Sequence, residues 1–442
     1  MQTEVKSKFP YAVVSAVQLP SVSDLEFEAS LAELCDLSKT LGYQVVHTFT
    51  QKRAVFDTAA YLGRGKRMEM RDFISASELP DHGTGPIQMV FVDHEISPSQ
   101  ARNLENDIGC DVMDRTMVIL GIFHRNARSR AARAQVEIAR LGYMAPRLRE
   151  MAKLAGPQGR QRSGTGGRGA GESHTELDKR KIRDRIAELQ QEIVAMDAER
   201  QTQRSRRQGR QSLSSVALVG YTNAGKSTLM RALTGSEVLV ENKLFATLDT
   251  TVRALHPVTV PHVLVTDTVG FIKNLPHGLV ASFKSTLEEA LDASLLLHVV
   301  DASDPGFVRQ IEVTHQVLAE IHAETVPHLL VFNKLDQVGD VVMQTAHEVM
   351  LREHYPDCIV MSAHRKHDVT VLHQAIVAFF QKDLTEIEIF LPWSAQKLRS
   401  EIFSACVVLE ERADAAGAFL RVRGTPIVLD SMISRLAEEP VA

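Results

Sequence analysis

A glycine-rich loop between an apolar strand and a helix most strongly constrains the fold of this chain. The apolar run 216–219 is followed at once by a stretch that fits the pattern G-x-x-x-x-G-K-[ST]. Glycines at these spacings let backbone N–H groups close around phosphate oxygens, and the start of the next helix adds a favourable dipole. The pattern predicts a phosphate-binding loop in a doubly wound α/β domain. Its residues are Gly220, Tyr221, Thr222, Asn223, Ala224, Gly225, Lys226 and Ser227.

A second motif, D-x-x-G, follows the next apolar strand, 263–266. Lys226 of the first motif is expected to reach the β- and γ-phosphates, and the Ser227 hydroxyl to bind Mg²⁺. In the second motif, Asp267 is expected to hold the magnesium through water, and the Gly270 amide to sense the γ-phosphate. We therefore predict Lys226 and Gly270 as catalytic residues. The second motif adds four nucleotide-binding residues, Asp267, Thr268, Val269 and Gly270.

Two further strand ends carry residues suited to a guanine base. The apolar run 329–332 ends in Asn-Lys-x-Asp, and the run 358–361 ends in Ser-Ala. The Asp336 carboxylate can accept hydrogen bonds from the ring N–H and the exocyclic amine of guanine, which adenine lacks. Backbone N–H groups after the second run suit the guanine O6. The order of all four elements predicts GTP as the substrate, with base-side residues Asn333, Lys334, Leu335, Asp336, Ser362, Ala363 and His364.

The composition fits an ordinary cytosolic protein of about three domains. The chain has 442 residues, 44% of them apolar, and no apolar run reaches the roughly 18 residues of a membrane span. An apolar signal-peptide segment is also absent from its first residues. The four cysteines lack metal-binding spacing, so a zinc site is not expected. We expect a cytoplasmic monomer, with part of the population associated peripherally with the membrane.

The net charge of −5 conceals a strongly basic region. Residues 125–210 hold 21 Lys and Arg against 10 Asp and Glu. One interpretation is a polyanionic partner for this region, and the other is a solvated helical face rich in arginine.

The chain is predicted to contain four domains in an α/β multidomain architecture. Residues 1–115 alternate strands and helices, which indicates a small parallel α/β domain. Residues 116–213 are predicted as two long helices that form an antiparallel basic hairpin, with a coiled-coil seam along the second helix. A P-loop G domain spans 214–381, and a small α+β domain spans 382–442. The seam consists of Ile182, Ile186, Leu189, Ile193 and Met196, opposite Ala132, Val136, Ala139 and Tyr143.

The break between the two long helices, residues 156–171, contains seven glycines and three arginines. It has no bulky apolar residue, so it cannot bury enough surface to order itself. It is either a plain linker or a cationic tip loop that becomes ordered on RNA.

Several longer motifs resemble the HflX family of GTPases over nearly the whole chain. In the G domain they are 244–249, 267–272, 275–277 with 279–280, and 283–289; in the N-terminal domain they are 61–66, 97–105 and 114–116. The resemblance implies a GTPase that binds the large (50S) ribosomal subunit and its rRNA. It also implies that the ribosome stimulates hydrolysis, and that the protein acts on stalled, idle or stressed ribosomes. The alternatives are an RNA-modification or ribosome-assembly accessory GTPase, and a signalling switch for a protein partner.

A switch segment before the D-x-x-G strand should complete the magnesium shell with a threonine hydroxyl when GTP is bound. Thr247, Thr250 and Thr251 are the candidates, and the family resemblance favours Thr247, so the predicted magnesium ligands are Ser227 and Thr247. The nucleotide-binding residues of this segment are Phe245, Ala246, Thr247, Leu248 and Asp249.

Four positions depart from what is usual in the family or in related GTPases. Gly167 and Ala170 stand in the tip loop where the family usually has Thr and Pro, and Thr250 stands where it often has Pro. Phe271 stands where many small GTPases carry a water-positioning Gln. A phenyl ring cannot orient water, even if it also packs in the core, so we expect slow hydrolysis until a partner completes the site.

Overall fold

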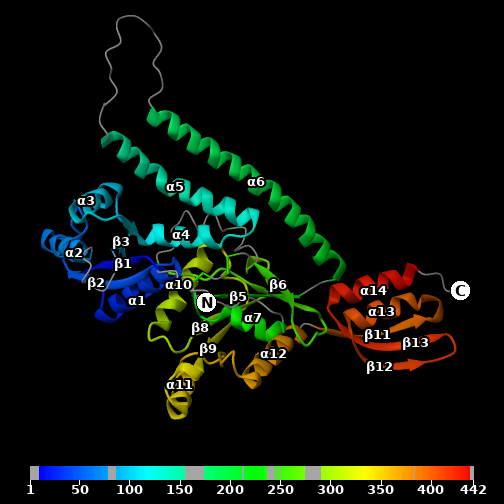
Figure 1. Cartoon of the computed structure of the whole chain (residues 1–442). Coiled ribbons are helices and arrows are strands. Elements are labelled where there is room, and N and C mark those ends of the chain that lie inside the picture. Colours follow the sequence, from blue (N-terminus) through cyan, green and yellow to red (C-terminus); the bar gives the residue numbers. More distant parts are fainter. Residues whose placement is uncertain are drawn as a thin grey trace, which may run out of the picture. The chain divides into compact units, whose positions relative to one another are not determined.

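The structure is a computed structural model that describes nine segments of the chain (Figure 1). They are residues 9–77, 86–154, 174–211, 214–235, 244–245, 247–248, 250–273, 290–382 and 384–438. The chain divides into two compact units. The first comprises Met1–Val194, Lys243–Leu248 and Asn274–Phe283, and the second comprises Ala195–Asn242, Asp249–Lys273 and Lys284–Ala442.

The first unit contains a four-stranded parallel sheet in the order β2-β1-β3-β4. Its strands are β1 (Tyr11–Gln18), β2 (Gln44–Lys52), β3 (Ile87–Val92) and β4 (Val112–Asp114). The helices between them are α1 (Asp24–Thr40), α2 (Arg64–Ser77) and α3 (Pro98–Ile108), and α4 (Arg115–Asn126) follows β4. One face of the sheet packs its valines against Met70 and Ile74 of α2 and Leu104 and Ile108 of α3. The predicted small parallel α/β domain is confirmed.

Local sequence signals explain where α3 begins. Pro98 occupies its first turn, the Ser97 side chain accepts from the Gln100 backbone N–H, and the Gln100 side chain accepts from the Ser97 N–H. This reciprocal pair satisfies backbone donors that a helix start otherwise leaves open.

Two long helices, α5 (Arg130–Leu154) and α6 (His174–Gln211), form the predicted antiparallel pair. Ion pairs join Arg185 to Glu137 and Arg130 to Glu192, so residue numbers fall along one helix as they rise along the other. Leu189 of the predicted seam is buried, as are Ala132, Val136 and Ala139 opposite it. Tyr143 instead directs its hydroxyl to Asp114. The predicted tip loop lies outside the described residues.

The prediction of a single first helix from residue 116 is wrong. That stretch is divided into α4 and α5, and the helical backbone stops at Ala127. The Ser129 hydroxyl accepts from the Ala132 N–H at 3.1 Å and caps the new helix, while Arg133 donates to the Ala127 carbonyl at 3.2 Å. A side-chain cap and a guanidinium thus satisfy the backbone groups at the break.

The second unit contains a six-stranded sheet in the order β10-β9-β8-β5-β7-β6, in which β6 alone among these strands is antiparallel. Its strands are β5 (Ser214–Gly220), β6 (Thr251–Ala254), β7 (Val263–Asp267), β8 (Leu295–Asp301), β9 (His328–Asn333) and β10 (Ile359–Val360). One face packs against α7 (Lys226–Thr234) and α12 (Lys366–Gln381). The other packs against α10 (Phe307–Glu320) and α11 (Val341–His354), as Figure 1 shows. This is the predicted doubly wound domain.

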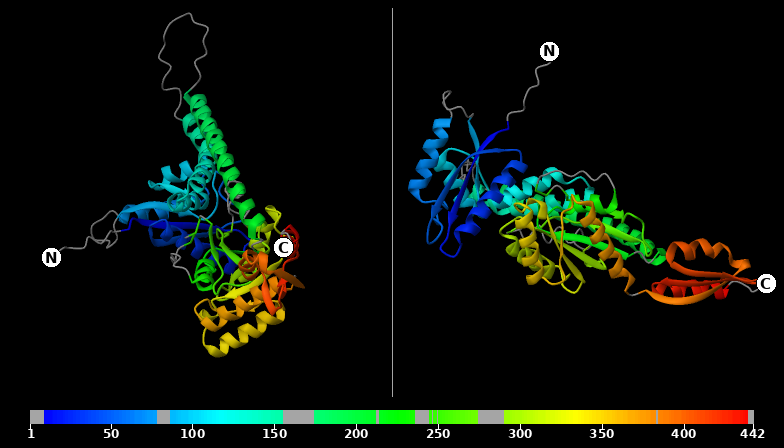
Figure 2. Two further views of the ribbon diagram at one scale, coloured as in Figure 1. Left: turned by 90° about the vertical axis from the view of Figure 1, so that its right-hand side faces the viewer. Right: turned by 90° about the horizontal axis from the view of Figure 1, so that it is seen from below.

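The last part of the described chain contains a three-stranded antiparallel sheet in the order β11-β13-β12. Its strands are β11 (Thr385–Pro392), β12 (Val407–Ala413) and β13 (Gly417–Gly424), and its helices are α13 (Lys397–Ala405) and α14 (Pro426–Glu438). Both helices share one apolar core with one face of the sheet (Figure 2). The predicted α+β fold is confirmed, whereas the bounds of the four domains stay predictions.

Candidate nucleotide-binding site

The glycine-rich loop turns sharply from β5 into α7. Both of its glycines are required, because each has a positive φ and a side chain there would clash with a neighbouring strand or loop. Gly220 has φ of 141°, and a Cβ there would lie 2.1 Å from the Val299 carbonyl oxygen of β8. Gly225 has φ of 94°, and a Cβ there would lie 2.3 Å from the Asn333 amide nitrogen. Any larger residue at either position would force the loop away from its neighbouring strands.

Lys226, at the start of α7, is folded into the loop that it follows. Its ammonium donates to the carbonyl oxygens of Gly220 at 3.0 Å and Tyr221 at 2.7 Å, and only 6% of the residue is exposed. Burial lowers the pKa of Lys226 to about 8, because desolvation penalises its charged form. An anionic phosphate would reverse this effect, so the lysine is poised to bind one.

Ser227 and Asp267 come together although they are 40 positions apart in sequence. The Ser227 hydroxyl donates to the Asp267 carboxylate at 2.7 Å, and Asp267 is fully buried at the end of β7. A hydroxyl and a carboxylate are hard oxygen donors, so this pair fits a magnesium site completed by phosphate oxygens. No group of three or more His, Cys, Asp or Glu able to hold a metal occurs among the described residues.

The D-x-x-G segment lies directly against the phosphate-binding loop. The Thr268 hydroxyl donates to the Leu218 carbonyl of β5 at 2.6 Å. A Cβ on Gly270 would lie 2.8 Å from Thr222 Cα and 3.0 Å from Lys226 Nζ. The side chain of Phe271 is 1% exposed, so it does pack in the core. The structure therefore brings Gly270 beside Lys226, and their roles at the γ-phosphate stay predictions.

Only part of the predicted switch segment lies within the described residues. Ala246 and Asp249 lie outside them, Thr247 is half-buried, and Leu248 is buried. Phe245 has a positive φ of 55° and packs its ring against Phe123, with ring centroids 4.6 Å apart. The Phe245 carbonyl also accepts from the Asn126 side chain at 2.9 Å. Both partners are on α4, and no spacing in the sequence indicated this contact.

Asn333 joins the phosphate loop to the base-side loop. Its side chain donates to the Ala224 carbonyl at 3.0 Å and accepts from the Ala363 N–H at 2.9 Å. The Ser362 hydroxyl accepts from the His364 N–H at 3.2 Å, which holds the turn that follows. The structure thus places Asn333 as a tie between the two loops.

Lys334 and Asp336 complete the base side. Lys334 has φ of 62° and forms an ion pair of 2.7 Å with Asp301 at the end of β8. Asp336 Oδ1 is buried and receives no hydrogen bond from the described residues. A buried acceptor without a donor is costly, and the N–H groups of a guanine edge would satisfy it.

Sequence reasoning missed two acidic residues that fix this region. Asp301 binds Lys334, and Asp368 accepts from the Ser362 N–H at 2.9 Å. Asp301 directly follows the mostly apolar run 295–300, and its position at a strand end is a signal that would have found it. Asp368 lies in the first turn of α12 and carries no such signal.

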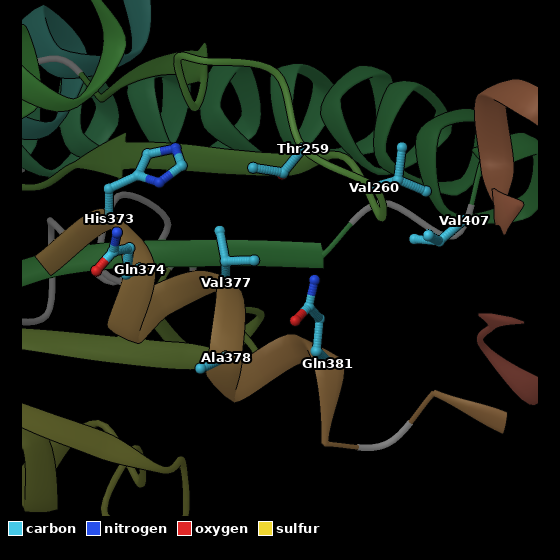
Figure 3. A pocket seen from close by; sticks show the side chains of 8 residues that line it. All are labelled: Thr259, Val260, His373, Gln374, Val377, Ala378, Gln381 and Val407. Carbon is cyan, nitrogen blue, oxygen red and sulfur yellow. The ribbon is translucent and has the colours of Figure 1, made fainter. Parts of the chain in front are cut away.

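A separate pocket of about 530 Å³ lies away from these motifs (Figure 3). Thr259 and Val260 line one side, α12 residues from His373 to Gln381 line another, and Val407 closes one end. None of the residues of the phosphate or base motifs lines it, so it is not the nucleotide site.

Three family models match consecutive parts of the chain. Residues 28–124 match a model described as GTP-binding GTPase N-terminal, and residues 126–207 match GTP-binding GTPase Middle Region. Residues 215–334 match a model described as 50S ribosome-binding GTPase. GTPase HflX of Gluconacetobacter diazotrophicus is 50% identical, over 98% of this chain and 99% of the relative. The chain belongs to the HflX family of GTPases.

One more HflX relative and one solved structure are more distant from this chain. GTPase HflX of Escherichia coli is 36% identical over 94% of each chain. Among solved structures, a GTP-binding protein from Sulfolobus solfataricus in complex with GDP is 22% identical, covers 85% of this chain and 99% of that one, and has a TM-score of 0.43. The family and the loop geometry together identify this HflX protein as an enzyme that hydrolyses GTP. Among the described helices, none combines the length and apolar character that a membrane crossing requires.

Proposed function

We propose that this HflX GTPase binds the large ribosomal subunit through its rRNA and that the bound subunit accelerates GTP hydrolysis. Its role would be in translation or stress recovery, on stalled or idle ribosomes, as a cytoplasmic monomer. The observation that carries the proposal is the basic hairpin of α5 and α6, with 21 Lys and Arg against 10 Asp and Glu in residues 125–210. The description of the matching G-domain model, 50S ribosome-binding GTPase, points to the same partner.

The ion pairs along the hairpin are compatible with a phosphate partner. Arg130 and Arg180 form pairs with Glu192 and Asp184 while their side chains stay 83% and 63% exposed. Exposed pairs of this kind contribute about 0–1 kcal/mol, so rRNA phosphates can recruit the same guanidinium groups at little cost. Such contacts position a protein without reading base sequence.

In this proposal each residue of the candidate site has a separate role in binding the phosphates or the magnesium ion. Lys226 neutralises the β- and γ-phosphates, and the Gly270 N–H binds the γ-phosphate. Ser227 and Thr247 would hold Mg²⁺, which supplies positive charge at the phosphates when bound, and Asp267 supports it through water. Phe271 supplies no group that could orient water, so in this proposal the ribosome provides that group.

Co-sedimentation with purified large subunits tests the proposal. We expect binding with a non-hydrolysable GTP analogue, weaker binding with GDP, and a steep loss of binding with added salt. Arg180→Gln combined with Arg183→Gln should reduce the salt slope by about one for each phosphate that is no longer neutralised. Arg352→Gln, which removes an exposed, ion-paired arginine from α11, is the matched control. Absence of co-sedimentation at low salt with either nucleotide would refute the proposal.

A further inference from the structure

Tyr221 connects the phosphate-binding loop to the residues that follow the D-x-x-G motif. The two segments form an isolated parallel bridge at Tyr221 and Phe271. Thr222 N–H donates to the Phe271 carbonyl at 2.7 Å, and Phe271 N–H donates to the Gly220 carbonyl at 3.1 Å. The Tyr221 hydroxyl adds a third link, because it accepts from the Lys273 N–H at 2.8 Å.

These three hydrogen bonds lie immediately after Gly270. The backbone pair holds Phe271, and the hydroxyl holds Lys273, so the segment 270–273 is attached to the loop at both its middle and its end. Gly270 is consequently pressed against the loop, with the position of a Cβ only 3.0 Å from the Lys226 ammonium.

The tyrosine is not required by the phosphate-loop pattern itself, in which this position accepts any residue. Its side chain is nonetheless buried, with 8% of the residue exposed. A phenol is rigid, with two rotatable bonds, and carries its acceptor far from the backbone. It can therefore reach a backbone N–H of the neighbouring segment at a small cost in side-chain entropy.

We propose that Tyr221 is a positioning residue for GTP hydrolysis. Its hydroxyl fixes Lys273, and through the short segment 270–273 this keeps the Gly270 amide at the γ-phosphate end of the loop. The inference rests on the assignment of Gly270 to the γ-phosphate in the proposed function, and it needs no ribosome. Tyr221 touches no reacting atom in this role, and it acts only through the backbone that it holds.

The test compares Tyr221→Phe with the unmodified full chain. The variant keeps the ring, so the core packing is preserved, and it removes the hydroxyl that accepts from the Lys273 N–H. We expect single-turnover GTP hydrolysis without ribosomes to slow by about five- to tenfold, the usual effect of removing one hydrogen bond. GDP affinity should stay within about twofold, because GDP has no γ-phosphate for Gly270 to bind. Tyr355→Phe, which removes a tyrosine hydroxyl from the C-terminal end of α11, is the matched control.

Amide hydrogen exchange in peptides covering 268–273 gives a second readout. In Tyr221→Phe we expect faster exchange of the Lys273 amide, with no change in Tyr355→Phe. An unchanged hydrolysis rate, an equal loss of GDP affinity or unchanged exchange would each overturn the inference. A second variant, Gly270→Ala, distinguishes failure of the γ-phosphate assignment from failure of the role proposed for Tyr221. If Gly270→Ala hydrolyses GTP normally, the γ-phosphate assignment fails, whereas normal hydrolysis by Tyr221→Phe alone refutes only the role of Tyr221.

Discussion

Asp336 is the residue on which guanine selection depends. Its Oδ1 is buried without a donor among the described residues, and the guanine edge offers two N–H groups. Asp336→Asn should lower GTP affinity by about 2 kcal/mol or more, which is roughly thirtyfold, because a donor then replaces an acceptor. Calorimetric titration with GTP and ATP measures the effect. Asp340→Asn, which keeps an acceptor at the start of α11, should bind GTP normally. Equal affinity of the unmodified protein for GTP and ATP would contradict this assignment.

The buried ammonium of Lys226 predicts that nucleotide affinity depends on pH. Burial lowers its pKa to about 8 in the protein without nucleotide, and an adjacent phosphate raises it again. Above that pH the empty protein binds fewer protons than the complex, so binding must take up a proton. GDP affinity should therefore fall as the pH rises above about 8, by up to about tenfold per unit.

Fluorescence titration of GDP on both sides of pH 8 checks this dependence. Lys226→Ala should bind GDP weakly, should fail to hydrolyse GTP in a single turnover, and should lose the lysine's part of the pH slope. Any pH dependence that remains in this variant measures the contribution of the guanine base, which also titrates, and can be subtracted. Affinity that stays constant through pH 8, or normal hydrolysis by Lys226→Ala, would show that the ammonium does not bind phosphate.

At the scale of elements, the packing of α10 on β8 contains a costly buried histidine. His298 is 1% exposed, and neither ring nitrogen has a hydrogen-bond partner among the described residues. Desolvation, and then the neighbouring His315 ring with its centroid 5.3 Å away, lowers the pKa of His298 to about 3. His315 of α10 and His328 of β9 are the titratable groups beside it, and Lys226 adds a weaker repulsion.

This histidine should make the protein less stable in acid. Its pKa is near 6.5 in the unfolded chain, so between about pH 3 and 6.5 the unfolded state binds more protons, and stability falls as the pH drops through that window. His298→Leu should raise the free energy of unfolding by about 1 kcal/mol at pH 7 and flatten the acid slope. Denaturant unfolding at neutral and acid pH, with the exposed His354→Leu as control, measures both. An unchanged slope would contradict the prediction.

The hairpin offers a second element-scale prediction. Deleting residues 156–171 should leave GTP binding intact, because the loop is far in sequence from every nucleotide motif. It should reduce GTP turnover in the presence of large subunits, if its arginines contact rRNA. Replacing the loop by a glycine-serine linker of equal length separates charge from length. Full stimulation of the deleted protein by large subunits would refute a role for the tip.

The sequence predicted those elements whose buried residues form an apolar pattern within a short stretch of the chain. The apolar runs before Gly220, Asp267 and Asn333 are buried strands in the structure, and the motif residues lie at their ends. β12 could not be predicted from its own residues, because residues 409–413 are exposed and mostly charged and the strand depends on pairing with β13. α14 is different, because the buried Leu429 and Met432 have a helical spacing that indicates this helix.

Much of the candidate site could be predicted because its motif residues directly follow apolar runs. The hydrogen bonds that join its loops could not be predicted. The spacing of residues in the sequence selected Lys226, Ser227, Asp267 and Gly270, and the structure brings them together. Their roles at the phosphates stay predictions. The bonds from Asn333 to Ala224 and Ala363 join residues 109 and 30 positions apart, so only the folded chain reveals them.

At the scale of the whole molecule, the HflX family and the basic hairpin converge on one proposal. The G domain has the loops for GTP but, at Phe271, a buried phenyl ring where a water-orienting side chain would be useful. A basic helical region precedes that domain in the chain. Binding of a large polyanion and completion of the catalytic site would then be two parts of one event.

GTP turnover with and without purified large ribosomal subunits tests whether the ribosome stimulates hydrolysis. The measurement uses the full chain at low salt with excess GTP, and the reference is the same reaction without large subunits. We expect slow turnover by the protein alone and an increase of about a thousandfold or more with large subunits, as partners that complete a GTPase site produce. Added salt should abolish the increase before it affects GTP binding. Turnover that large subunits leave unchanged at low salt would contradict the account.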